Sequence, residues 1–165
     1  MESLEVHLEN YQRIYFRPDQ PNPAPVEPRA TTLVKFFDLC RTDEFAQTLR
    51  YIQVPSYYTW QKGEKGWQRR KQGKPIEGHP GIRFSDTLGR VHTVPPNQEE
   101  AYCLRMLLNE LTGPTSFDAL KRVGEIQYDT FKDACRARKL LGKHKKSLTE
   151  KYITYNIIFQ MMINT

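Results

Sequence analysis

The residues best suited to chemistry lie between positions 57 and 74, where aromatic and basic side chains alternate with glycine. Two runs of β-forming residues flank the polar segment 61–66, and this pattern predicts a hairpin. Trp60 and Trp67 would then face each other across the strands, where aromatic pairs stabilise a ribbon. The segment 61–74 holds six Lys or Arg residues against one Glu. An exposed ribbon of this kind suits a phosphate backbone with stackable bases.

The candidate nucleic-acid contacts are two tryptophans for stacking and six cations for phosphates: Trp60, Trp67, Lys62, Lys65, Arg69, Arg70, Lys71 and Lys74. The alternative is a solvated hairpin whose tryptophans belong to a hydrophobic core. The residues alone leave both interpretations open.

The sequence lacks the residue combinations needed for ATP hydrolysis, for nucleophilic catalysis and for metal binding. No G-x-x-x-x-G-K-[ST] phosphate loop is present, so ATP hydrolysis is not expected from this chain. The four histidines are isolated, and no Ser-His-Asp or Cys-His arrangement follows from the spacing. The three cysteines, Cys40, Cys103 and Cys135, are scattered, which favours a reducing compartment over a disulfide framework or a zinc site. We predict no catalytic residue and no metal ligand.

Composition agrees with a polyanionic partner. The chain has 165 residues, a net charge of +6 and a pI near 9.2, which favour nucleic acid among partners. Hydrophobic residues make up 38%, which is low, so part of the chain is expected outside a compact core. Neither a signal peptide nor a membrane span is expected, which predicts an intracellular protein with no membrane partner.

Three segments are predicted to position these residues. Residues 1–28 would form a hairpin over 4–16 and a proline-rich linker. Residues 29–142 would form the domain, with a helix over 33–40 capped by Thr31 or Thr32 and a shorter helix over 44–49. Strands are expected over 51–60 and 89–94, with a turn at 79–81 between them. Residues 143–165 would form a basic and then apolar tail.

Three short capped helices are predicted in the second half of the domain. Asn97 and Glu100 form a capping-box pattern before the first, Ser116 precedes the second, and Thr130 with Asp133 opens the third. The expected fold class is α+β, with a small, mostly antiparallel sheet that includes the hairpin and the 90–94 strand, packed against these helices. A helix-turn-helix role in reading DNA is a further interpretation, although such helix pairs more often serve packing alone.

The order of several motifs resembles a known family. They are Asp43-Glu44-Phe45-Ala46, Pro55-Ser56-Tyr57-Tyr58-Thr59-Trp60, Trp67-Gln68-Arg69-Arg70-Lys71, Gly89-Arg90-Val91-His92-Thr93-Val94, Glu100 to Asn109, Gly113-Pro114-Thr115-Ser116-Phe117 and Tyr128 to Cys135. In this order they resemble the segment between the replication-initiator nuclease and the ATP-dependent DNA helicase of Helitron transposon proteins. The resemblance covers roughly residues 4–142.

The resemblance implies a DNA-contacting accessory region of a rolling-circle transposase-helicase, located in the nucleus, with single-stranded DNA and the neighbouring nuclease and helicase domains as partners. In the full-length family, ATP and magnesium serve the helicase motor in DNA recombination and repair. The two-histidine metal motif and the phosphate loop are absent from this chain, and the sequence after Leu141 departs from the family, which implies a truncated copy. The alternative is a spacer between nuclease and motor that touches no DNA, with an exposed apolar patch on Leu104, Leu107 and Leu111.

Overall fold

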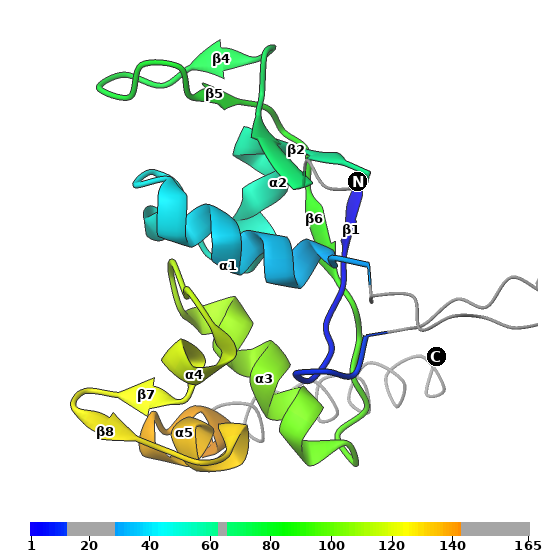
Figure 1. Cartoon of the computed structure of the whole chain (residues 1–165), viewed down its shortest axis with the longest axis vertical. Helices are drawn as coiled ribbons and strands as arrows, with labels where there is room; N and C mark the ends of the chain where they lie inside the picture. Colours follow the sequence, from blue (N-terminus) through cyan, green and yellow to red (C-terminus); the bar gives the residue numbers. More distant parts are fainter. Residues whose placement is uncertain (13–28, 63–65, 143–165) are drawn as a thin grey trace, which may run out of the picture.

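The protein has an α+β fold of short helices and two-stranded sheets, as the composition of its segments predicted. The computed structural model describes residues 1–12, 29–62 and 66–142 (Figure 1). Its helices are α1 (Thr32–Thr42), α2 (Val54–Tyr57), α3 (Glu99–Glu110), α4 (Phe117–Leu120) and α5 (Phe131–Ala137), with 3-10 turns η1 (Ala46–Thr48) and η2 (Tyr51–Gln53). The 13–16 part of the predicted N-terminal hairpin, the predicted linker over 17–28 and the tail from residue 143 lie outside the described residues.

Within the described residues the strands form four separate pairs rather than one small sheet. The antiparallel pairs are β2 (Tyr58–Gln61) with β3 (Gly66–Arg69), β4 (Lys74–Pro75) with β5 (Arg83–Phe84), and β7 (Arg122–Val123) with β8 (Ile126–Gln127). The remaining pair, β1 (Glu2–Leu4) with β6 (Gly89–Val91), is parallel. The prediction that the hairpin and the 90–94 strand share a sheet is therefore wrong.

The N-terminal residues belong to the domain instead of forming the beginning of a separate hairpin. Glu2 lies opposite Gly89 and Leu4 opposite Val91, and the Leu4 side chain is fully buried. A hydrogen bond of 2.6 Å between Ser3 Oγ and the exposed His92 ring also joins β1 to the residue that follows β6. The expected N-terminal strand of the hairpin over 4–16 overlaps the observed strand only at Leu4, because β1 ends there and residues 5–12 form no strand. Local alternation does not choose the partner strand either.

Helix α1 follows its sequence signals closely. The Thr31 side chain accepts a hydrogen bond from the Val34 amide at 3.3 Å and so caps the first turn. The spacing of Leu33, Phe36, Phe37 and Cys40 puts these four side chains on one buried face. The expected helix over 44–49 is reduced to the 3-10 turn η1.

Residues 51–57 were expected in a strand, and this prediction is wrong. They form η2 and α2, with Pro55 in the first turn of α2, where its missing amide hydrogen costs no helical hydrogen bond. Tyr51 is fully buried, and its hydroxyl donates to the Glu5 carbonyl at 2.9 Å and lies 2.7 Å from Thr32 Oγ1. Tertiary contacts thus override the strand preference of the tyrosines here.

The three C-terminal helices form, with one change in their capping. Ser116 accepts from the Ala119 amide at 3.0 Å and Thr130 from the Asp133 amide at 3.1 Å, which confirms both predicted caps. Helix α4 ends at Leu120, and the next residues form β7 instead of continuing the helix. Helix α3 begins after Gln98 without a side-chain cap, so the capping box of Asn97 and Glu100 is wrong.

Glu100 caps a different helix from the one it begins. Its carboxylate oxygens accept the Phe131 and Lys132 amides, both at 3.0 Å, at the N-terminus of α5. Because the first amides of a helix have no acceptor within it, this carboxylate supplies the partner that the Phe131 and Lys132 amides lack. The contact fixes α5 against α3 at their N-terminal ends.

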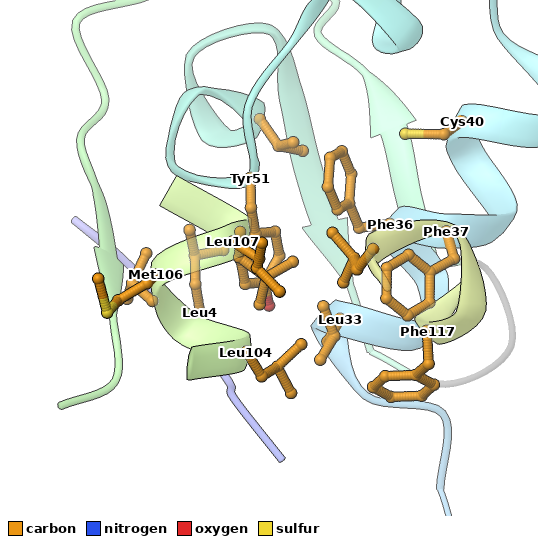
Figure 2. Close-up of a cluster of buried hydrophobic side chains, with 14 of the residues drawn as sticks. Leu4, Leu33, Phe36, Phe37, Cys40, Tyr51, Leu104, Met106, Leu107 and Phe117 are labelled. Atoms are coloured by element: carbon orange, nitrogen blue, oxygen red, sulfur yellow. The ribbon is translucent and has the colours of Figure 1, made fainter. Parts of the chain in front are cut away.

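The core lies between α1 and α3 and includes β1, η2 and α4 (Figure 2). Side chains from all of these elements meet there, and Phe37 and Phe117 pack edge to face with ring centroids 5.0 Å apart. Leu104 and Leu107 are fully buried, and Leu111 is partly buried. The apolar patch expected of a spacer on these leucines is therefore not exposed. The three cysteines are free and buried.

Candidate nucleic-acid interface

The predicted aromatic hairpin forms in the predicted register. Trp60 in β2 lies directly opposite Trp67 in β3, and the two rings pack edge to face with centroids 5.2 Å apart. We call residues 58–69 the hairpin. Lys62 is exposed at its turn, and Lys65 lies outside the described residues. The ribbon of the sequence prediction is therefore confirmed as a local structure.

The two tryptophans have different environments. Trp67 is only 5% exposed, and its indole Nε1 donates to the Thr32 carbonyl of α1 at 3.0 Å. A ring buried in this way has no free face on which a base could stack. Trp60 is partly exposed, so part of this residue remains accessible to solvent. The structure thus places Trp67 in the core, and the stacking role assigned to it does not fit.

Arg69 belongs to an ion pair at the end of β3. Its Nε lies 2.9 Å from Asp43 Oδ2, while half of the Arg69 side chain stays exposed. Burial raises the pKa of Asp43, but the hydrogen bond and charge of Arg69 together with the hydrogen bond from the Phe45 amide outweigh it, so the pKa lies below its usual value. The pair fixes the guanidinium while leaving part of it accessible to solvent.

The Arg70 guanidinium forms hydrogen bonds within the protein. Its Nε and Nη2 donate to the Pro55 carbonyl at 2.9 and 2.8 Å, and Nη2 also donates to Thr87 Oγ1 at 2.9 Å. These bonds join α2 to the segment that follows β5. A guanidinium engaged on both sides in this way serves structure first, so Arg70 is a poor candidate for a phosphate contact.

A second ribbon carries the remaining basic residues. We call residues 71–84 the arm; it comprises β4, a turn and β5 and projects from one end of the molecule (Figure 1). Lys71 and Lys74 are exposed on it, and none of the ion pairs among the described residues involves them or Lys62. Sequence reasoning missed Arg83, which is exposed on β5 and donates to the Gly73 carbonyl at 3.2 Å.

Sequence reasoning also missed a group of rings formed where the arm packs against Phe45 and Tyr57. Phe45 packs against Tyr57 and His79 with centroid distances of 4.9 and 5.0 Å, and Tyr57 packs against Phe84 at 5.6 Å. We call these four residues the ring cluster. They come from separate parts of the chain and follow no helical or strand period, so no sequence pattern connects them.

The remaining observations concern other kinds of site. No group of His, Cys, Asp or Glu within residues 1–12, 29–62 and 66–142 could hold a metal ion. In the same part of the chain, no helix has the length and apolar character needed to cross a membrane. The sequence has no phosphate loop, and we assign no ATP-dependent step to its residues; that this chain holds neither ATP nor magnesium stays a prediction. Neither a protein-family model nor a curated protein matches this chain.

Proposed function

We propose that this protein is a DNA-contacting accessory domain, similar to the segment between nuclease and helicase in Helitron transposon proteins. It acts in the nucleus and binds single-stranded DNA through the hairpin and the arm. It performs no reaction of its own, and neighbouring nuclease and helicase domains would supply catalysis.

The observation that carries the proposal is the set of exposed cations Lys62, Arg69, Lys71 and Lys74, which we call the basic surface. Three of the four have no ion-pair partner among the described residues, so phosphates would not compete with an internal carboxylate for them. Cations of this kind bind a nucleic-acid backbone by releasing its counterions, which makes the affinity depend on salt.

The test is a fluorescence-anisotropy titration of the whole chain with single-stranded and duplex DNA at several salt concentrations. For single strands, the slope of log K against log salt is negative, and each lost phosphate contact reduces its magnitude by about 0.7. Replacing Lys71 and Lys74 together by alanine should therefore reduce the magnitude of the slope by about 1.4. The matched control replaces Arg122 and Lys139, two exposed cations outside the basic surface. Circular dichroism verifies that each variant is folded.

A salt-independent affinity, or an equal loss in the control variant, would refute the phosphate contacts.

One observation favours the second function, an interaction module without nucleic-acid contact. The apolar side chains of Met1, Ile52 and Leu88 are exposed and line a shallow groove beside Arg90. A folded protein that binds neither DNA at low salt would leave this groove as the better candidate for its contact surface.

A further inference from the structure

We propose that the ring cluster, rather than the tryptophan pair, is the base-stacking platform of this protein for single-stranded DNA. This inference rests on the proposed function and specifies which residues would take the bases. It assigns stacking to Phe45, Tyr57, His79 and Phe84, and phosphate contact to Arg69 and Lys74 beside them.

The first argument is accessibility. His79 is exposed in the turn of the arm, and Phe45, Tyr57 and Phe84 are partly exposed. Four connected rings with solvent-facing surface provide what Trp67, buried at 5% exposure, does not. Base stacking needs a ring face that a base can reach, and it tolerates any base because every base has a π-face.

The second argument is the position of the nearest cations. Arg69 reaches the same turn of the arm, because its Nη1 lies 3.5 Å from where a Cβ of Gly81 would stand, two residues beyond His79. Asp43 accepts from both the Arg69 Nε and the Phe45 amide, at 2.9 and 3.0 Å. One carboxylate therefore binds both the Arg69 guanidinium and the backbone of the residue that carries one ring of the platform.

The second cation beside the ring cluster is Lys74, which belongs to the arm. Lys74 in β4 lies directly opposite Phe84 in β5. Side chains of directly opposed residues stand on the same face of a ribbon, so an exposed ammonium accompanies the Phe84 ring. Positive charge thus adjoins the rings from both the hairpin and the arm. This combination of cations and rings is typical of surfaces that bind single strands.

The exposed rings also predict whether single-stranded or duplex DNA is preferred. In a duplex the base faces are stacked on each other and are not available to side chains, whereas a single strand presents them. The platform therefore predicts a preference for single-stranded over duplex DNA. It also predicts that the bases, and not only the phosphates, contribute to the affinity.

The experiment separates bases from phosphates. The whole chain is titrated by fluorescence anisotropy with a labelled oligothymidylate of about 15 nucleotides and with an abasic strand of the same length. Both strands carry the same charge, so phosphate contacts alone would bind them equally. We expect the thymidylate to bind about 10-fold more tightly than the abasic strand.

His79→Ala should reduce this preference about 5-fold or more while leaving the affinity for the abasic strand unchanged. Phe84→Leu, which keeps an apolar side chain at the base of the arm, should act in the same direction. The matched control is Tyr11→Ala, because Tyr11 is a tyrosine with 75% exposure that is not part of the ring cluster. It should alter neither affinity, and circular dichroism verifies that each variant is folded.

The outcomes distinguish the two levels of the proposal. Equal binding of both strands would overturn the stacking platform and leave the phosphate contacts standing. A preference for bases that survives both His79→Ala and Phe84→Leu would overturn this location for the platform. Failure of a folded wild-type chain to bind either strand at low salt would overturn the proposed function itself.

Discussion

Removal of the Glu100 carboxylate should destabilise the protein more than removal of the neighbouring carboxylate of Glu99. Glu100 accepts the first amides of α5, from Phe131 and Lys132, at 3.0 Å each. Glu99 instead forms an exposed ion pair with the Lys132 ammonium. The two glutamates are adjacent in sequence and both begin α3, so the comparison isolates the contact with α5.

The magnitude follows from the groups left without a partner. A charged acceptor at a helix N-terminus typically contributes about 1 kcal/mol for each amide it satisfies. Glu100→Ala leaves two such amides at a helix whose Phe131 and Ala134 side chains are buried, so we expect a loss of about 2 kcal/mol. Glu100→Gln keeps an oxygen acceptor without the charge and should lose about half as much.

The assay is thermal unfolding of the whole chain, monitored by circular dichroism. For a domain of this size a loss of 2 kcal/mol lowers Tm by roughly 8 °C. Glu99→Ala should change Tm far less, because exposed ion pairs contribute little and are screened by salt. The reasoning fails if Glu100→Ala and Glu99→Ala lower Tm by the same amount.

Three further perturbations test other contacts. Asp43→Asn should lower the free energy of unfolding at pH 7, as measured by urea unfolding. The pKa of the Asp43 carboxyl is lowered in the folded protein, so the stability that its charge contributes is lost as it becomes protonated. The difference between Asp43→Asn and wild type should therefore shrink as the pH falls below about 4. Trp67→Phe removes the buried hydrogen bond from the indole to the Thr32 carbonyl and should cost about 1 kcal/mol in urea unfolding, and an unchanged midpoint would contradict this contact. Gly73→Ala places a Cβ 2.2 Å from a β5 carbonyl oxygen at a φ of +126° and should speed amide exchange over 74–84. Gly78→Ala also meets a strained φ, of +77°, but no atom within 4 Å, so it should speed exchange less than Gly73→Ala, and an equal effect would contradict the close approach at Gly73.

Features that depend on near neighbours could be predicted from the sequence. The hairpin register with Trp60 opposite Trp67, the Thr31 cap of α1 and the Ser116 and Thr130 caps all join residues that are close in the chain. Each is encoded by a short pattern whose hydrogen bonds close within a few residues. The α+β fold class follows from these elements.

Features that join distant residues could not be predicted in the same way. Glu100 resembles a capping-box residue because its spacing from Asn97 fits, yet its carboxylate satisfies amides of Phe131 and Lys132, about 30 residues away. The parallel pairing of β1 with β6 joins residues nearly 90 positions apart. A local pattern shows that a group can form a contact, but only the packed chain decides with which partner.

The candidate site illustrates the same division. The sequence by itself determined that an aromatic ribbon forms and that six cations occur between positions 62 and 74, of which Lys65 lies outside the described residues. Only the tertiary structure decided that Trp67 faces α1, that Arg70 bonds to Pro55 and that four rings from separate segments meet at the arm. The physical reason is that residue type fixes which interactions a side chain can make, whereas exposure depends on which distant segments pack against it.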